Sequence, residues 1–299
     1  MNKTIQIIAP SFYAQLTAKQ KKHIQTFLTK HNFQVLWGKN TFKQTVEISV
    51  GQARASDKER LKDLMNAFKK NPDIILAIRG GGSVSHLLPL INWDLLKKST
   101  SIFAGFSDLT AFQNAYYAKT GKPSITGIIA SHLKEQPQES ITASFFNTLS
   151  GGGINFNGLP CFASGHTTGT LIGGNLSSFM HLIGTPYLPN LKGKILLLED
   201  VAVPPYKIDE MLTHLKNAGI FDKINGVILG DFYKCRNVLD KTDNNAYNVL
   251  KNFFKGFKIP VMYGIPYGHT PQHFCFPLGT KTTMDTKKKI VFIDGIKKN

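Results

Sequence analysis

Residues 101–120 constrain the fold most, because their pattern changes from strand to helix around one hydroxyl group. The apolar run 102–106 is typical of a buried strand, and the apolar residues that follow recur at helical spacing: Leu109, Phe112, Ala115 and Tyr116. Gly105 and Ser107 therefore occupy a sharp strand-to-helix turn. Such a turn lifts a serine clear of the sheet and directs the first amides of the helix towards whatever the serine attacks.

Two interpretations of Ser107 follow from this turn. A serine at this place can be a nucleophile, or it can cap the helix that follows. The local sequence is G-F-S-D-L, so the second glycine of the G-x-S-x-G nucleophile turn is missing. The motif alone therefore leaves both interpretations open.

The strand and helix patterns alternate along most of the chain. Strands are expected at 4–9, 33–37, 74–78, 124–129, 194–198, 226–229 and 260–264, and helices near 17–31, 141–149, 206–218 and 244–255. Ser56 and Glu59 have capping-box spacing, which predicts a further helix that begins there. This alternation predicts an α/β protein whose N-terminal part is a mostly parallel sheet covered by helices.

The length of 299 residues favours two domains. We expect an N-terminal α/β domain at 1–150, a glycine-rich connection at 151–168, and a C-terminal α/β domain at 169–299. The last segment, 276–294, reads as a β-hairpin that turns through the polar residues 285–288.

Composition and charge limit the class of protein. No stretch is long and apolar enough to span a bilayer, and the first segment lacks the features of a signal peptide. The three cysteines, Cys161, Cys235 and Cys275, are widely spaced, which argues against disulfides and zinc and favours the cytoplasm. The formal net charge of +17 raises nucleic acid as a partner, but the lysines are scattered, so we expect a solvated basic surface.

Three further polar features stand where predicted strands end. The loop Arg79-Gly80-Gly81-Gly82-Ser83 follows one strand, and its glycines either form a tight turn or let backbone amides approach a ligand. Glu199 and His269 follow two later strands. Because sites in α/β sheets form at the carboxyl ends of strands, these residues together with Ser107 supply a nucleophile, a base and an acid that orients the base.

The order and spacing of these segments resemble the LD-carboxypeptidase family of serine peptidases, of the muramoyltetrapeptide carboxypeptidase type. The resemblance is carried by AIRGGGS, GFSDLTAF, GTLIGGNLSS, LIGTPYLPNLKGKILLLEDV, PPYKIDEMLTHLKNAGIF, GVILGDF and IPYGHTPQHFCFPLG, over residues 75–280. It implies a two-domain homodimer with a catalytic triad at the domain junction. Matched residue by residue, the triad falls on Ser107, Glu199 and His269.

The resemblance also implies a substrate and a mechanism. The family releases a C-terminal D-amino acid, typically D-alanine, from murein tetrapeptides. No metal or cofactor is expected. The oxyanion is expected to meet the N–H of Asp108 and an amide of Gly81 or Gly82. Arg79 and Ser83, at the two ends of the glycine loop, are expected to contact the substrate.

One departure from the family pattern bears on specificity. The family's glycine loop commonly reads R-G-G-Y-G, whereas Gly82 and Ser83 follow the second glycine here, so an aromatic residue is replaced. Three alternatives therefore stay open: a related amidase that acts on a peptide-nucleotide antibiotic, a catalytically silent protein that binds murein peptides, and a nucleic-acid binder.

Overall fold

The computed structural model describes residues 3–49, 52–236 and 245–297. Within them, sheet A has the strand order β14-β7-β6-β5-β1-β2. Its strands are β1 (Lys3–Ile8), β2 (Phe33–Trp37), β5 (Ile74–Ala77), β6 (Ile102–Gly105), β7 (Ser124–Thr126) and β14 (Phe276–Leu278). Every neighbouring pair is parallel except β14 with β7. The predicted mostly parallel sheet is confirmed.

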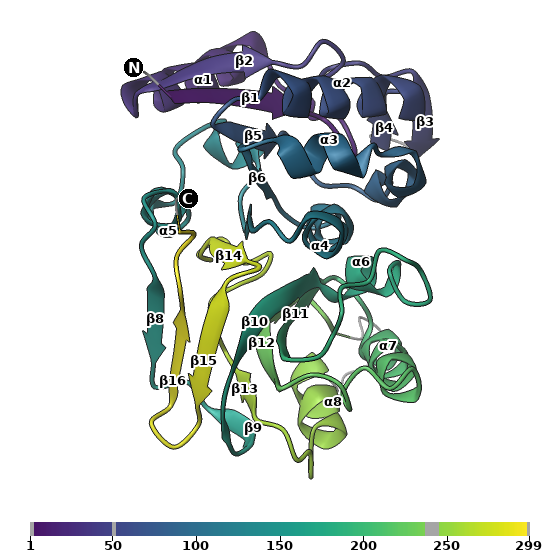
Figure 1. Ribbon diagram of the computed structural model, residues 1–299, viewed down its shortest axis with the longest axis vertical. Helices are drawn as coiled ribbons and strands as arrows, with labels where there is room; N and C mark the ends of the chain where they lie inside the picture. Colours follow the sequence, from purple (N-terminus) through teal and green to yellow (C-terminus); the bar gives the residue numbers. More distant parts are fainter. Residues whose placement is uncertain (1–2, 50–51, 237–244, 298–299) are drawn as a thin grey trace.

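Sheet C lies below sheet A in Figure 1 and has the order β8-β16-β15-β10-β11-β12-β13-β9. Its strands are β8 (Ile154–Asn157), β9 (Cys161–Ala163), β10 (His166–Asn175), β11 (Lys194–Val201), β12 (Gly226–Tyr233), β13 (Val261–Tyr263), β15 (Lys281–Asp285) and β16 (Ile290–Ile293). The four strands from β10 to β13 are parallel, and the outer strands are antiparallel. A small hairpin pairs β3 (Val46–Ser49) with β4 (Gln52–Arg54).

Helices cover both large sheets. They are α1 (Ala18–Lys30), α2 (Asp57–Lys70), α3 (Trp93–Lys98), α4 (Leu109–Thr120), α5 (Glu139–Leu149), α6 (Leu176–Met180), α7 (Pro205–Asn217) and α8 (Ala246–Phe253), with short 3-10 helices η1 (Val84–Leu90) and η2 (Ala130–Leu133). The capping box predicted at Ser56 and Glu59 is present at the start of α2. Residue 244, where the last helix was expected to begin, lies outside the described residues.

The hydrophobic core explains why α4 is central. Alternate residues of the sheet A strands point to opposite faces, so Ile7 and Leu76 pack in one cluster and Ile8 and Ile75 in another. The second cluster continues through α4 into the interior of sheet C. Figure 1 shows α4 between the two sheets, where it contacts both β6 and β10. The strand-to-helix turn at Ser107 therefore lies where the two halves of the chain meet.

Two segments differ from what the sequence led us to expect. Part of the expected connection 151–168 forms β8 and β9, which pair with β16 and β13, strands more than ninety residues away. The hairpin predicted over 276–294 is confirmed only as β15 and β16. Its first part, β14, pairs with β7 in sheet A, because the chain turns at Gly279, whose φ of +84° suits glycine. The division into domains stays a prediction.

No helix among the described residues is long and apolar enough to cross a membrane.

Candidate active site

Ser107 lies in the turn that its sequence predicts. β6 ends at Gly105 and α4 begins at Leu109, and Ser107 between them has a φ of +65° and is partly exposed. A non-glycine residue in this region is strained, by about 1–3 kcal/mol, and such strain is concentrated at functional sites. Gly105 makes the turn possible, because a Cβ on it would lie 2.9 Å from Cβ of Leu109. A left-handed serine at a strand-to-helix turn is the geometry of an exposed nucleophile.

The glycine loop after β5 passes directly beside this serine. A Cβ on Gly80 would lie 2.9 Å from Cβ of Ser107 and 3.2 Å from its Oγ. A Cβ on Gly81 would overlap the ring of Phe12 and Oγ of Ser11, whereas one on Gly82 would meet only Phe12, at 3.9 Å. The backbone of Gly80 and Gly81 is therefore packed too closely for any side chain, while Gly82 is exposed.

Glu199 and His269 form a hydrogen-bonded pair. Oε2 of Glu199, near the end of β11, lies 2.8 Å from Nδ1 of His269. Glu199 is fully buried, whereas the His269 side chain is 21% exposed, so the pair presents its imidazole and hides its carboxylate. The imidazole packs on Phe106, with 4.5 Å between the ring centroids. Since Phe106 directly precedes Ser107, the base lies beside the turn that carries the nucleophile.

The structure thus brings the three predicted triad residues into one region. No hydrogen bond joins Ser107 Oγ to the imidazole within the described ranges. Catalytic hydrogen bonds are commonly long before substrate binds and tighten in the complex. The geometry shows an oriented base next to an exposed serine.

Asn175 fixes the Glu199 carboxylate from the other side. Its Nδ2 donates to Oε1 of Glu199 at 3.1 Å and to Oδ1 of Asp200 at 3.0 Å. Asp200 in turn accepts hydrogen bonds from the N–H and Oγ of Ser177. Burial raises the pKa of Glu199, and the hydrogen bonds from His269 and Asn175 oppose that rise by stabilising the charged form.

The loop that carries His269 is held at several points. Gly268 has a φ of +147°, and a Cβ there would lie 3.2 Å from Oε2 of Glu199. Oγ1 of Thr270 donates to Oδ2 of Asp231 at 2.9 Å, and Nε2 of His273 donates to the carbonyl of Gly127 at 2.7 Å. The imidazole is therefore positioned by contacts on both sides of its own residue.

Asp108, predicted as an oxyanion donor through its N–H, has a side chain that ties two loops together. Its Oδ2 accepts hydrogen bonds from Oγ of Ser11 at 2.5 Å and from the N–H groups of Ser83 and Val84, both at 3.0 Å. The Arg60 guanidinium also donates to the carbonyls of Pro10 and Ser83. These contacts fix the position of the glycine loop relative to Ser107.

The two predicted substrate contacts occupy different surroundings. Arg79 is partly exposed and donates to the carbonyl of Tyr13 at 3.5 Å. Ser83 is buried, and its hydroxyl has no hydrogen-bond partner among the described residues. Their roles towards substrate stay predictions.

A cavity of about 360 Å³ opens beside the imidazole of His269. Phe106, His132 and Tyr233 are among its lining residues, so both halves of the chain contribute to it. Its size is that of a small-ligand site. No group of three or more histidine, cysteine, aspartate or glutamate side chains that could hold a metal occurs in the part of the chain that the structure describes.

Comparison with known proteins identifies the family. The LD-carboxypeptidase N-terminal domain matches residues 5–127, and the LD-carboxypeptidase C-terminal domain matches residues 168–284. The chain belongs to the LD-carboxypeptidase family. The resemblance expected from the sequence is thereby confirmed, and family membership supports a peptidase activity.

Two LD-carboxypeptidase relatives cover nearly the whole chain. A probable murein peptide carboxypeptidase of Bacillus subtilis is 28% identical over 98% of this chain and 92% of its own length. The microcin C7 self-immunity protein MccF of Escherichia coli is 30% identical over 97% of this chain and 92% of its own length.

Solved structures show the same fold. The crystal structure of muramoyltetrapeptide carboxypeptidase from Oxalobacter formigenes has a TM-score of 0.83, with 27% identity over 98% of each chain. The structure of MccF in complex with glutamyl sulfamoyl guanosine has a TM-score of 0.85, with 25% identity over 98% of this chain and 96% of that one. The two-domain α/β LD-carboxypeptidase fold is therefore confirmed.

Sequence reasoning missed several residues of the site. It placed Asn175 at a helix start without its contact to Glu199, and it gave Ser11 and Phe12 no role. The only signal for Asn175 was its place at the end of a parallel strand, where it lies opposite Glu199 in the register. Ser11 follows the first strand in the same way.

Proposed function

We propose that this protein is a serine-type LD-carboxypeptidase that releases a C-terminal D-amino acid, typically D-alanine, from murein tetrapeptides. The observation that carries the proposal is the Glu199–His269 hydrogen bond of 2.8 Å beside the left-handed turn at Ser107. The family membership and the probable murein peptide carboxypeptidase relative support the choice of substrate.

The proposed reaction uses these residues in two steps. Oγ of Ser107 attacks the carbonyl carbon of the scissile bond while Nε2 of His269 accepts the hydroxyl proton. The tetrahedral intermediate collapses, the C–N bond breaks, and the imidazolium protonates the leaving amine. Water, activated by the same imidazole, then attacks the acyl-enzyme and releases the shortened peptide. Glu199 holds the imidazole in the productive tautomer and stabilises its charged form.

The developing oxyanion needs donors on the glycine-loop side of Ser107. We assign this role to the N–H of Asp108 and to an amide of Gly81 or Gly82. The close approach of the glycine loop to Ser107, marked by the 3.2 Å from an added Cβ of Gly80 to Oγ, supports the assignment. Loss of one such donor typically costs roughly 100- to 1000-fold in turnover.

We further propose that the protein acts in the cytoplasm as a homodimer, in the recycling of cell-wall peptides. The three free cysteines suit a reducing compartment. Sedimentation equilibrium of the full chain measures the oligomeric state, and a mass of one chain would contradict the dimer.

A panel of murein peptides tests the function. A tetrapeptide ending in D-alanine should lose that residue, whereas the tripeptide and a matched tetrapeptide ending in L-alanine should stay intact, with products read by mass spectrometry. Efficient release of L-alanine would contradict the LD assignment. Binding without any product would instead indicate a catalytically silent murein-peptide binding protein.

A second candidate is an amidase for a peptide-nucleotide antibiotic. It is favoured by the similarity to MccF and by the open space at Gly82, where a Cβ would meet nothing closer than 3.9 Å. A peptidyl sulfamoyl adenosine belongs in the same panel. Its hydrolysis, with no action on the tetrapeptide, would replace the first proposal by the second.

A further inference from the structure

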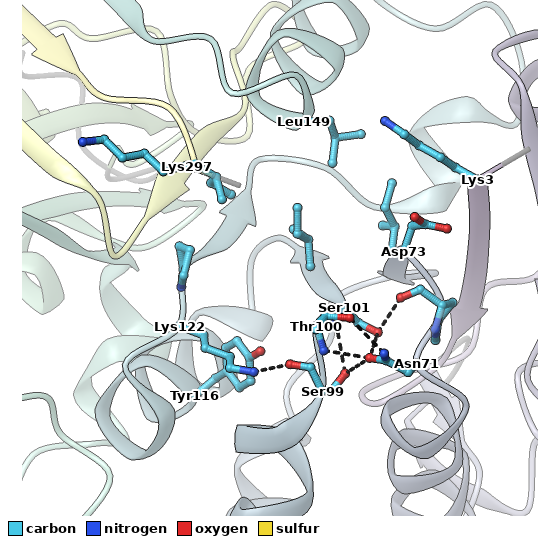
Figure 2. Close-up of a pocket in the computed structure, with 15 residues that line it drawn as sticks. Lys3, Asn71, Asp73, Ser99, Thr100, Ser101, Tyr116, Lys122, Leu149 and Lys297 are labelled. Carbon is cyan, nitrogen blue, oxygen red and sulfur yellow. Dashed lines mark hydrogen bonds between the residues drawn. The ribbon is translucent and has the colours of Figure 1, made fainter. Parts of the chain in front are cut away.

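A second cavity, of about 550 Å³, lies at the end of sheet A opposite to Ser107. Its lining includes Lys3, Ile74 and Ile102, the first residues of β1, β5 and β6, whereas Ser107 follows the last residue of β6. None of its lining residues lines the cavity beside His269. Figure 2 shows side chains from several segments of the chain around this space. The cavity is therefore separate from the candidate active site.

Tyr116 supplies an unpaired buried donor to this cavity. Its side chain is fully buried in α4, it lines the cavity, and its hydroxyl has no hydrogen-bond partner among the described residues. Buried hydroxyl groups without a partner are rare in native proteins and call for an explanation. Burial raises the pKa of Tyr116, so the hydroxyl keeps its proton and can donate to a bound group.

Three lysines from distant segments surround the same space. They are Lys3 at the start of β1, Lys122 before β7 and Lys297 in the C-terminal segment, and Figure 2 shows them on different sides of the cavity. None of them forms an ion pair with a described carboxylate. Lys122 donates to the carbonyl of Ser99, which fixes its ammonium group.

One carboxylate also lines the cavity, and it is already engaged. Oδ2 of Asp73 accepts hydrogen bonds from the N–H of Thr4 at 2.7 Å and from its Oγ1 at 3.0 Å. Three cationic groups against one carboxylate leave an excess of positive charge around the cavity.

The remaining walls are apolar. Besides Ile74 and Ile102, the buried side chains of Leu149 and Ile296 line the space, together with two prolines. Small-molecule sites combine such walls with a few polar groups that fix orientation, in volumes of about 300–1000 Å³. A free inorganic ion would leave these walls without a partner.

We propose that this cavity binds a small organic anion, with an apolar body against the isoleucines and leucine and a carboxylate or phosphate monoester group at Tyr116 and Lys122. The hydroxyl of Tyr116 donates to an oxygen of the anionic group, and the ammonium of Lys122 lies next to it. Lys3 and Lys297 attract the anion from the rim of the cavity.

Calorimetric titration of the full-length protein tests the site with four probes. Phenyl phosphate and benzoate carry the ring and the charge, inorganic phosphate has the charge alone, and benzyl alcohol has the ring alone. We expect saturable millimolar or tighter binding of at least one of the first two, and binding at least tenfold weaker for each of the last two. The tighter of the first two identifies the anionic group. Equal affinity for inorganic phosphate or benzyl alcohol would overturn the proposal, as would no saturable binding of either charged ring.

Substitutions locate the binding. Tyr116→Phe should weaken the binding of the better probe at least tenfold while the melting temperature of the unliganded protein stays the same or rises, because the hydroxyl forms no bond there. Lys122→Gln should weaken the binding similarly, and Lys297→Gln, in an exposed position, provides a variant that does not threaten the fold. Tyr206→Phe and Lys251→Gln are the matched controls, since both side chains are exposed elsewhere.

The turnover of the tetrapeptide separates this site from the catalytic one. Tyr116→Phe should keep the wild-type kcat/KM, because Tyr116 belongs to neither the proposed triad nor the oxyanion site. Binding of the probe that is unchanged in both Tyr116→Phe and Lys297→Gln would place it elsewhere and overturn the proposal.

Discussion

The side-chain amide of Asn175 donates a hydrogen bond of 3.1 Å to the buried carboxylate of Glu199, on the oxygen that does not face His269. The carboxylate is thus held between an amide and an imidazole. Each of these contacts favours its charged form against the effect of burial, which raises the pKa of Glu199. The state of the proposed triad depends on both.

Asn175→Ala should move the acidic limb of the pH profile of kcat/KM to higher pH. The substitution removes a donor to the charged form, so the pKa of Glu199 rises further and the carboxylate becomes protonated at a higher pH. A protonated Glu199 cannot stabilise the imidazolium. Because Asn175 also caps α6, Asn175→Asp serves as a second variant that keeps the cap and loses the donor. An unshifted limb in both variants would exclude this role for Asn175.

Glu199→Gln should lower kcat by roughly 10⁴-fold, and His269→Ala by more, up to roughly 10⁶-fold. The glutamine keeps the shape but supplies no negative charge to orient and stabilise the imidazolium, whereas the alanine removes the base itself. Steady-state release of D-alanine measures both. Equal losses accompanied by a lower melting temperature would indicate a structural role for Glu199 instead.

Asp108→Asn should lower the free energy of unfolding by roughly 1–3 kcal/mol and also reduce kcat/KM. The amide cannot accept all three hydrogen bonds that Oδ2 of Asp108 now accepts, so one buried donor in Ser11 or the glycine loop loses its partner. Urea unfolding and kinetics measure the two effects. The exposed Asp209→Asn, on α7, is the matched control. A variant as stable and active as this control would show that the clamp is dispensable.

Gly80→Ala should lower kcat/KM by roughly 100-fold, the usual cost of displacing a reacting group by about 1 Å. Its added methyl group would lie 2.9 Å from Cβ of Ser107, so the nucleophile or the glycine loop must shift. Gly82→Ala is the matched control, two residues along the same loop, where the nearest atom is 3.9 Å away. It should change kcat/KM by no more than about twofold. Equal effects at the two positions would contradict the close approach at Gly80.

The aromatic residue that the family pattern places in the glycine loop is absent from the loop, and yet an aromatic ring lies there. Phe12, from the segment after β1, packs against Gly81 and is the nearest side chain to Gly82. Gly82→Tyr should therefore narrow the range of D-residues released, because its ring must share the space beside Phe12. Rates for tetrapeptides ending in D-alanine, D-serine and D-methionine measure this range. An unchanged range would remove the loop from specificity.

Local patterns in the sequence were sufficient for the elements of the fold and for the turn at Ser107. The periodicities that mark β6, α4 and α2 depend on neighbours within a few residues, and so does the capping box at Ser56. Family resemblance then selected Glu199 and His269. Their hydrogen bond joins residues seventy positions apart.

Contacts between distant segments could not be read in the same way. β9 pairs with β13 and β14 with β7 because the sheets offer open edges there, and nothing in the strands' own residues names the partner. The clamp of Asp108 on Ser11 spans 97 residues, and the Asn175 contact depends on the register of two parallel strands. Such contacts follow from packing of the whole chain.

The most direct test of the account compares Ser107→Ala with the wild-type protein on one murein tetrapeptide ending in D-alanine. The account predicts that kcat falls by roughly 10⁶-fold, because the hydroxyl is the nucleophile, while calorimetry gives nearly the same Kd for the peptide and the melting temperature is unchanged. A variant that still releases D-alanine at more than about one per cent of the wild-type rate would contradict the claim that Ser107 attacks the substrate.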